Sequence, residues 1–221
     1  MITVHHLSNS RSQRILWLLE ELGVAYDVKR YERQPTQLAP ESLKSVHPLG
    51  KSPVITDDGK VIAESGAIVD YLIETYGKGR LMPPAGSPER LRYRYWTHYA
   101  EGSAMPPLVM KLIFSQIPKS PQMPFFLRPV ARAMFGGITK SYLDPQIAAH
   151  VALWTAELET SPYFAGAELT GADIMMSFPL EAAAAAQSLP PALASYLLRI
   201  HDRPEYQRAL ARGGPYELAK K

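Results

Sequence analysis

Residues 47–54 read His47-Pro48-Leu49-Gly50-Lys51-Ser52-Pro53-Val54, an irregular loop that runs directly into a short apolar segment. Because proline has no N–H to donate to a sheet, Pro53 belongs at the start or the edge of a strand, and its peptide bond is a candidate for the cis form. An open edge at Val54 would leave a backbone N–H and C=O free to pair with an extended peptide. The plain alternative is a turn that only begins a strand.

The segments around this loop alternate between short β-like runs and helical patterns. Strands are predicted at residues 2–6 and 26–31, and a hairpin with the turn Asp58-Gly59 joins two more at 54–55 and 61–62. A first helix begins at Arg11 and ends at Gly23, because four apolar residues before that glycine fall on one helical stripe: Ile15, Leu18, Leu19 and Leu22. A second helix runs from Ser65 to Gly77. This alternation predicts an N-terminal α/β domain.

The remainder of the chain shows no convincing strand. Residues 77–88 are rich in glycine and proline, and we place a linker at 79–88, between a domain at 1–78 and a second domain at 89–221. Pro106-Pro107 should kink or break the first helix of the second domain. The predicted helices cover residues 89–117, 128–160, 171–187, 191–202 and 204–213. The second domain is therefore predicted to be all-helical.

The composition excludes several classes of function. The 221 residues include no cysteine, which removes disulfides, thiolate metal sites and any nucleophilic thiol of the protein itself. The histidines lack partners at metal-ligand spacing, so we predict no metal site. The net charge of +3 comes from scattered basic residues, which argues against a nucleic-acid partner. Without a long apolar run or a secretory signal, we expect a cytoplasmic protein with no membrane insertion.

Glu64-Ser65 stands where the fourth predicted strand gives way to a helix. A helix N-terminus offers unpaired N–H groups and positive partial charge, to which Ser65 adds a hydroxyl and Glu64 a carboxylate. This set suits the zwitterionic head group of an amino acid, with its carboxylate at the helix end and its ammonium near Glu64. The alternative is that Ser65 is only an N-cap.

Ser8-Asn9-Ser10-Arg11-Ser12-Gln13-Arg14 joins the first strand to the first helix. A hydroxyl here would face whatever occupies the cleft beyond the strand end, and it could lower the pKa of a bound thiol by donating a hydrogen bond to the thiolate. Ser10-x-x-Gln13 also fits a capping box, which is a purely structural role. No Gly-x-Ser-x-Gly elbow surrounds these serines, which argues against a hydrolase.

Four motifs, in this order, resemble the successive signatures of the cytosolic glutathione S-transferases. They are Ser10 to Arg14 with the following Ile-Leu-Trp-Leu-Leu-Glu-Glu-Leu, the 47–54 loop, Ala63-Glu-Ser-Gly-Ala-Ile, and Leu169-Thr-Gly-Ala-Asp-Ile. The loop and residues 172–180, Ala-Asp-Ile-Met-Met-Ser-Phe-Pro-Leu, are most similar to the fungal and bacterial branch. The resemblance spans nearly the whole chain. It implies a thioredoxin-like first domain of order βαβαββα that binds glutathione, and a helical second domain with an apolar pocket for a second substrate.

The resemblance also implies roles for individual residues. Ser65 and Glu64 would hold the γ-glutamyl end of glutathione, the backbone of Val54 would pair with the cysteinyl unit after a cis Pro53, and Lys51 with His47 would meet the glycyl carboxylate. Ser10 would be the catalytic hydroxyl, with Asn9 or Ser12 as other contributors near the thiol. The first 25 residues hold no tyrosine, which excludes a tyrosine-type mechanism, and the missing cysteine excludes the cysteine-type classes.

Two sets of residues in the helical domain have candidate roles. Four residues at near-helical spacing could line the apolar pocket, although core packing explains them equally well: Trp96, Tyr99, Met110 and Phe114. Thr170-x-x-Asp173 is predicted to form a capping box, with Leu169 and Ile174 as a hydrophobic staple, and so to start a core helix.

These observations together predict a cytoplasmic glutathione transferase that directs the glutathione thiolate at an apolar electrophile, in detoxification, or at a hydroperoxide, as a glutathione peroxidase. The alternatives are a non-catalytic glutathione- or ligand-binding protein of the same fold, and a structural module. The resemblance also implies a homodimer. Residues 1–77 hold 8 basic and 10 acidic residues and 78–221 hold 16 and 11, so opposite net charges of −2 and +5 would face each other between copies.

Overall fold

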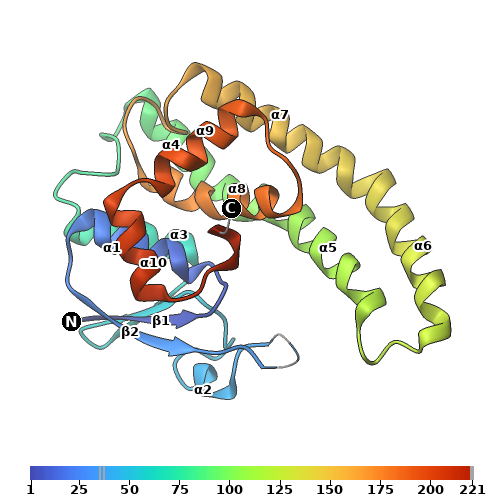
Figure 1. Cartoon of the computed structure of the whole chain (residues 1–221). Helices are drawn as coiled ribbons and strands as arrows, with labels where there is room; N and C mark the ends of the chain where they lie inside the picture. Colours follow the sequence, from blue (N-terminus) through green and yellow to red (C-terminus); the bar gives the residue numbers. More distant parts are fainter. Residues whose placement is uncertain (35, 37, 220–221) are drawn as a thin grey trace.

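The computed structural model describes residues 1–34, 36 and 38–219, and its first 76 residues form a mixed sheet with helices on both faces (Figure 1). The elements follow in the order β1 (Ile2–Leu7), α1 (Ser12–Leu22), β2 (Tyr26–Tyr31), α2 (Glu41–Lys44), β3 (Val54–Asp57), β4 (Lys60–Ala63) and α3 (Ser65–Tyr76). The predicted βαβαββα order of a thioredoxin-like domain is confirmed.

The strands of this sheet run in the order β2-β1-β3-β4, with β1 parallel to β2 and antiparallel to β3. Asp58 and Gly59 close the β3–β4 hairpin, and both have the positive φ (45° and 82°) that a tight two-residue turn requires. Val54 is paired with His5 on β1 and with Ala63 on β4. The prediction of an open edge at Val54 is therefore wrong, because the edge strand on that side is β4.

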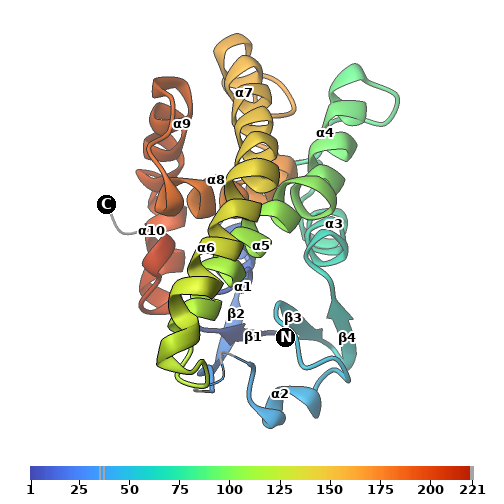
Figure 2. The ribbon, with the colours of Figure 1, turned by 90° about the vertical axis from the view of Figure 1, so that its right-hand side faces the viewer.

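Helices α1 and α3 cover one face of the sheet, and the short α2 lies on the other face (Figure 2). The predicted apolar stripe of α1 is buried, because this helix packs between the sheet and the C-terminal helices. Gly23 ends α1 in the left-handed conformation, with φ 67°, as the sequence predicts. On the opposite face, Leu43 of α2 packs with Leu7 and Tyr31 in a small separate cluster.

The helical part of the chain follows the loop that begins at Gly77. Its elements are α4 (Pro88–Tyr99), the π-helical turn η1 (Ala100–Ala104), α5 (Met105–Gln116), the 3-10 turns η2 (Ile117–Lys119) and η3 (Phe125–Leu127), α6 (Arg128–Ile138), the π-helical turn η4 (Thr139–Leu143), α7 (Asp144–Thr160), α8 (Gly171–Ala186), α9 (Pro191–His201), α10 (Pro204–Gly213) and the 3-10 turn η5 (Glu217–Ala219). No strand was predicted here, and the described residues form only a single isolated β-bridge, Tyr163 to Gly166. The last two residues of the predicted second domain lie outside the described residues.

A π-helical turn stands where a kink or break was predicted at Pro106-Pro107, and the helix does not end there. Within η1 the N–H of Met105 donates to the carbonyl of Ala100, and the chain continues directly into α5. The turn η4 precedes Pro145 in the same way, with the N–H of Asp144 bonded to the carbonyl of Thr139. Proline has no N–H for the ordinary helical bond, and the wider turn accommodates that loss without ending the helix.

The helix α8 begins with the predicted capping box and lies at the centre of the molecule. Thr170 accepts a hydrogen bond from the N–H of Ala172 at 3.2 Å, and the carboxylate of Asp173 accepts one from the N–H of Thr170 at 2.9 Å. Asp173 is fully buried, and it also accepts bonds from the N–H of Phe164 and the hydroxyl of Tyr196. Burial raises the pKa of Asp173, although these bonds oppose the shift. The cap therefore also ties α8 to α9.

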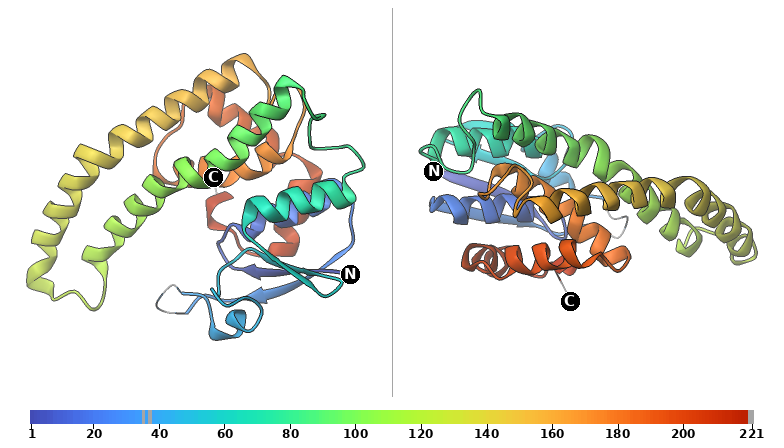
Figure 3. Two further views of the ribbon diagram at one scale, coloured as in Figure 1. Left: turned by 180° about the vertical axis from the view of Figure 1, so that it is seen from behind. Right: turned by 90° about the horizontal axis from the view of Figure 1, so that it is seen from above.

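Helices α5 and α6 form a long hairpin that projects away from the rest of the molecule (Figure 3). Phe114 and Phe135 pack against each other across the hairpin, with ring centroids 5.1 Å apart. Within the described part of the chain, the main hydrophobic core includes no residue from Met110 to Gln146. None of the described helices is both long enough and apolar enough to cross a membrane.

Candidate active site

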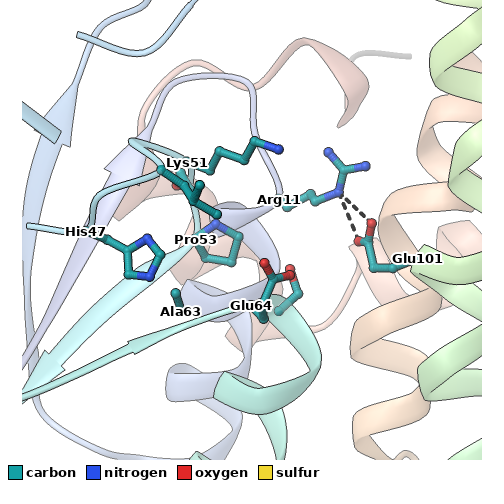
Figure 4. A pocket seen from close by; sticks show the side chains of 10 residues that line it. Arg11, His47, Lys51, Pro53, Ala63, Glu64 and Glu101 are labelled. Carbon is teal, nitrogen blue, oxygen red and sulfur yellow. Dashed lines mark hydrogen bonds and ion pairs between the residues drawn. The ribbon is translucent and has the colours of Figure 1, made fainter. Parts of the chain in front are cut away.

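A cavity of about 240 Å³ opens where the start of α1, the 47–53 loop and the β4–α3 junction meet the helical part (Figure 4). Basic and acidic side chains face the same hollow, with Lys51 and Arg11 on one side and Glu64 and Glu101 on the other. The lining residues are Arg11, His47, Leu49, Lys51, Ser52, Pro53, Ala63, Glu64, Ser65 and Glu101. The fold thus brings together five of the predicted site residues: His47, Lys51, Pro53, Glu64 and Ser65.

Gly50 and Pro53 determine the path of the 47–53 loop. Gly50 has a φ of 56°, and a Cβ at this position would lie 2.6 Å from Cγ of Lys44. The peptide bond between Ser52 and Pro53 is cis, as predicted. Ser52 lines the cavity and donates a hydrogen bond from Oγ to the carbonyl of His5 at 3.1 Å. Sequence reasoning missed Ser52, although its place directly before Pro53 in the loop motif is a usable signal.

Val54 and Asn9 lie outside the cavity lining, in contrast to their predicted contacts with a ligand. Val54 is only 1% exposed, inside a strand with neighbours on both sides. Asn9 has a left-handed backbone with φ 51°, and its Oδ1 accepts a hydrogen bond from the N–H of Glu217 at 2.8 Å. The Asn9 side chain therefore anchors the C-terminal turn η5.

Glu64 and Ser65 form the junction between β4 and α3. Glu64 has a φ of 72°, an uncommon conformation for a residue with a side chain. Glu64, not Ser65, is the N-cap of α3, and no side chain caps the helix. The alternative in which Ser65 serves only as an N-cap is therefore wrong. As the first residue of α3, Ser65 lies beside the unpaired N–H groups of the helix end.

Arg14 fixes Ser65 from behind the cavity. Its guanidinium is buried, and it donates to Oγ of Ser65 at 2.7 Å and to the carbonyl of Met175 at 2.7 Å. It also forms an ion pair with Glu101, which in turn accepts two hydrogen bonds of 2.9 Å from Nε of Arg11. The two carboxylate oxygens of Glu101 thus hold two cations at the N-terminus of α1.

Glu101 comes from the helical part and lies in the π-helical turn η1, which aims it across the cavity (Figure 4). Burial alone would raise the pKa of Glu101, but the nearby Arg14 and Arg11 outweigh burial and hold the pKa below its ordinary value of 4.5. The carboxylate is therefore ionised at neutral pH. Nothing in the sequence around Glu101 indicates this contact, because the partners are far apart along the chain.

The serines before α1 form a chain of hydrogen bonds that leads toward the cavity. Oγ of Ser12 lies 2.9 Å from Nδ1 of His6 and 2.8 Å from Oγ of Ser10, and Ser10 donates at 3.4 Å to Oγ of Ser52. Burial lowers the pKa of His6 to about 4, so its imidazole is neutral at neutral pH. Ser10 itself is only 5% exposed and stands behind Ser52, which lines the cavity.

The alternative role of Ser10 and Gln13, a capping box, is absent. Arg11 is the N-cap of α1 and no side chain caps the helix, while Oγ of Ser10 accepts a bond from the N–H of Ser12 at 3.3 Å. The amide of Gln13 is buried and has no hydrogen-bond partner among the described residues. The serine hydroxyls thus serve the chain from His6 to Ser52 instead of the reciprocal cap.

The four residues predicted to line an apolar second-substrate pocket are not part of the lining of the 240 Å³ cavity. Trp96 and Tyr99 are buried in the main core, where Trp96 packs on Phe164 with centroids 4.7 Å apart and Tyr99 accepts a bond from Nε1 of Trp154 at 3.1 Å. Core packing, the alternative explanation for Trp96 and Tyr99, is therefore the one that the structure supports. Met110 and Phe114 lie on α5, outside the lining of the 240 Å³ cavity.

Among the described residues, no group of three histidine, aspartate or glutamate side chains is arranged to hold a metal ion. The cavity lining offers charged side chains, hydroxyl groups and a helix end. It can hold an anion at two separate points, near Lys51 and at the start of α3, and a cation near Glu64.

Comparison with known proteins matches residues 1–74 to the family described as "Glutathione S-transferase, N-terminal domain". Glutathione S-transferase 3 of Schizosaccharomyces pombe is 38% identical over 187 residues, which cover 83% of this chain and 74% of that protein. Glutathione S-transferase 1 of Saccharomyces cerevisiae is 33% identical over 217 residues, which cover 93% and 92% of the two chains.

Solved structures give the same result. A glutathione S-transferase from Actinobacillus pleuropneumoniae superposes with a TM-score of 0.80 at 31% identity, over 100% of this chain and 97% of that one. A sphingomonad glutathione S-transferase in complex with glutathione shares the fold, with a TM-score of 0.73 at 22% identity over 96% and 98% of the two chains. Because these likenesses run through the sheet-bearing and the helical parts alike, the chain belongs to the glutathione S-transferase family, as a transferase whose co-substrate is glutathione.

Proposed function

We propose that the 240 Å³ cavity binds glutathione, with its γ-glutamyl carboxylate at the N-terminus of α3 and its glycyl carboxylate at Lys51 and His47. The Ser65 hydroxyl can donate to the first carboxylate while it accepts from Arg14. Glu64 would receive the γ-glutamyl ammonium. The main support for this proposal is that two anion-binding points and the Glu64 carboxylate share one cavity.

The cysteinyl unit of glutathione would lie against Ser52 and Pro53. This differs from the role predicted for Val54, whose strand is paired on both sides, whereas Ser52 and Pro53 line the cavity. Main-chain groups beside Ser52 would then fix the cysteine of an extended peptide. The thiol would point toward the end of the serine chain.

Ser10 is the hydroxyl that we propose to activate the thiol. Asn9 is engaged by Glu217, and Ser12 is fully buried between His6 and Ser10, which leaves Ser10 as the predicted hydroxyl that reaches Ser52. A hydroxyl that donates to the thiolate lowers the thiol pKa, and so raises the thiolate fraction near neutral pH. The thiol proton leaves to solvent when glutathione binds.

The thiolate then attacks the second substrate. With an electrophile such as an aryl halide, the new bond is sulfur to carbon and the halide leaves. With a hydroperoxide, the thiolate attacks the terminal oxygen, the O–O bond breaks, and glutathione becomes a sulfenic acid. The alkoxide that leaves takes a proton from solvent and becomes an alcohol, and the thiol of a second glutathione then converts the sulfenic acid to oxidised glutathione and water. Met110 and Phe114 on α5 are the proposed contacts of an apolar substrate, whereas Trp96 and Tyr99 are excluded because the core buries them.

The homodimer also belongs to this proposal. Exposed apolar residues lie on strand β4 and helix α4, which are on the same side of the molecule (Figure 2): Val61, Leu91 and Tyr95. Such an exposed apolar surface supports pairing of two copies. We place the domain boundary at 78, the linker at 79–88 and the second domain from 89, with detoxification in the cytoplasm as the role and the fungal and bacterial branch as the nearest group.

A titration that removes one charge at a time tests the placement of glutathione. Lys51→Ala should weaken the binding of glutathione about tenfold, but it should leave the binding of glutathione ethyl ester, which lacks the glycyl charge, unchanged. Lys60→Ala, an exposed lysine on β4 outside the cavity, is the matched control. Equal losses for both ligands, or no loss for either, would overturn the assignment of Lys51 to the glycyl carboxylate.

A further inference from the structure

The hairpin of α5 and α6 carries an unusual charge distribution. Residues 105–143 contain five basic residues and no aspartate or glutamate. The net charge of these 39 residues is therefore +5, which equals the net charge of residues 78–221 as a whole. Only Lys111 of the five forms an ion pair with a described residue, Asp144, at 2.8 Å, so Lys119, Arg128, Arg132 and Lys140 have no acidic partner within the described chain.

The same hairpin exposes large apolar side chains in an ordered pattern. Phe126, Val130, Met134 and Ile138 follow one another at intervals of four residues, and all four are exposed. Phe125, at the turn into α6, is 80% exposed. Leu112 and Ile113 add further exposed apolar surface on α5. Residues four apart lie on one side of a helix, so Val130, Met134 and Ile138 form an apolar stripe on α6 that faces solvent, and Phe126 precedes it in η3.

The opposite flank of α6 carries the basic residues. Arg128 and Arg132 are also four residues apart, and each lies two positions from the apolar stripe, roughly half a turn around the helix. Ala131, the buried residue of α6, and Phe135 face α5 between these two flanks. An apolar stripe with aromatic residues and a basic polar face is the pattern of a helix that lies in a membrane interface.

We propose that the tip of the α5–α6 hairpin adsorbs to an anionic lipid surface. The apolar side chains Phe125, Phe126 and Val130 would enter the headgroup region, and the unpaired basic residues would contact acidic headgroups. The hairpin projects beyond the body of the molecule, so its tip can reach a flat surface without a collision of the sheet-bearing part (Figure 3). This is peripheral adsorption, since no described helix can span a bilayer.

The charge of the α5–α6 hairpin favours a lipid surface over a second copy of the chain as the partner that binds there. A face with five positive and no negative charges fits a surface of one opposite sign, whereas residues 1–77 of a second copy mix 8 basic with 10 acidic residues. The apolar surface proposed for the dimer, at Val61, Leu91 and Tyr95, lies on other elements. Both surfaces can therefore be occupied at once.

Co-sedimentation of the full chain with vesicles tests the proposal. We expect the protein to pellet with phosphatidylcholine vesicles that contain about 30% phosphatidylserine, to stay in solution with phosphatidylcholine alone, and to be released by high salt. Phe125→Ser combined with Phe126→Ser should reduce the bound fraction about tenfold. Leu198→Ser, an exposed leucine on α9, is the matched control and should bind like the unaltered protein.

Two results would overturn the proposal. One is that the unaltered protein stays in solution with both vesicle types, or that the double variant pellets as well as the control does. The other is that the double variant changes from dimer to monomer in sedimentation velocity while no vesicle binding is seen, which would assign the hairpin to a second copy. Glutathione turnover, measured on the same samples, is expected to be unchanged and reports separately on the proposed function.

Discussion

Arg14 on α1 donates a hydrogen bond of 2.7 Å to Oγ of Ser65, the first residue of α3, so one buried guanidinium joins the two helices whose N-termini flank the cavity. The same group also bonds to the carbonyl of Met175 on α8 and pairs with Glu101 from η1. The position of Ser65 is therefore set by both the sheet-bearing part and the helical part of the chain.

Removal of the Ser65 hydroxyl should affect ligand binding more than folding. Ser65→Ala is expected to raise KM for glutathione about tenfold, because a donor to the γ-glutamyl carboxylate is lost, which corresponds to about 1.4 kcal/mol. Initial-rate kinetics against glutathione concentration measure this change. As a control, Ser87→Ala removes the N-cap of α4, which accepts from the N–H of Arg90 at 3.1 Å, and should cost about 1 kcal/mol of stability without a change in KM. A similar KM for both variants would contradict the role of Ser65.

Loss of the Glu101 carboxylate should make the stability of the protein less sensitive to acid. Glu101→Gln leaves Arg14 buried without its counter-charge and is expected to lower the free energy of unfolding by about 2 kcal/mol at pH 7, since Glu101 is partly exposed. The pKa of Glu101 in the folded protein lies below 4.5, so the stabilising pair is complete above pH 4.5 and is lost as the pH falls through the folded pKa.

Urea unfolding at a series of pH values checks this sign. The difference in stability between the unaltered protein and Glu101→Gln should be constant above pH 5 or so and should shrink toward zero at lower pH. A difference that grows as the pH falls would mean that the carboxylate is not held ionised by Arg14 and Arg11.

Tyr99 is expected to contribute to stability and not to substrate selection. Tyr99→Phe removes the acceptor of the Trp154 indole N–H and the partner of His150, and should cost about 1 to 2 kcal/mol in thermal or urea unfolding. The kinetic constants for an apolar electrophile should stay as they are. Tyr95→Phe, on an exposed ring stacked on Tyr99, is the control and should change stability by less than about 0.5 kcal/mol. A specific rise in KM for the electrophile in Tyr99→Phe would instead indicate that Tyr99 contacts the second substrate.

The close contact of α10 with α1 depends on a glycine. A Cβ at Gly213 would collide with Oε1 of Gln13 and lie 3.0 Å from Cδ1 of Leu16, so Gly213→Ala should destabilise the protein by about 1 to 3 kcal/mol. Gly136→Ala on α6 has no atom within 4 Å of its new Cβ and should instead stabilise the protein by about 0.5 to 1 kcal/mol. Thermal unfolding of both variants compares the two effects directly, and equal shifts would contradict the packing at Gly213.

The order of strands and helices follows from local patterns in the sequence, and so does much of the cavity. The apolar stripe of α1, the turn at Asp58-Gly59 and the capping box of Thr170 and Asp173 act within a few residues, so short sequence motifs predict them. His47, Lys51 and Ser65 are found for the same reason, because the loop and the helix end that carry them have recognisable composition.

The features that the sequence did not predict depend on contacts between distant segments. Glu101 joins the site only because η1 lies opposite α1, some 90 residues away along the chain. The pairing of Val54 on both sides depends on β1, and the burial of Trp96 and Tyr99 depends on Phe164 and Trp154. A helical spacing of aromatic residues is the same for a pocket wall and for a core, so periodicity alone does not separate them.

The central claim is that the chain lowers the pKa of the glutathione thiol through Ser10. It is tested most directly by the pH dependence of kcat/KM for a chlorodinitrobenzene, measured as the rate of thioether formation with glutathione. We expect an apparent pKa well below the roughly 8.5 of a free thiol, a rise toward that value in Ser10→Ala, and no change in Ser8→Ala, whose hydroxyl donates to Glu32 instead. A rate no faster than the uncatalysed reaction, or the same apparent pKa in Ser10→Ala as in the unaltered protein, would contradict the account.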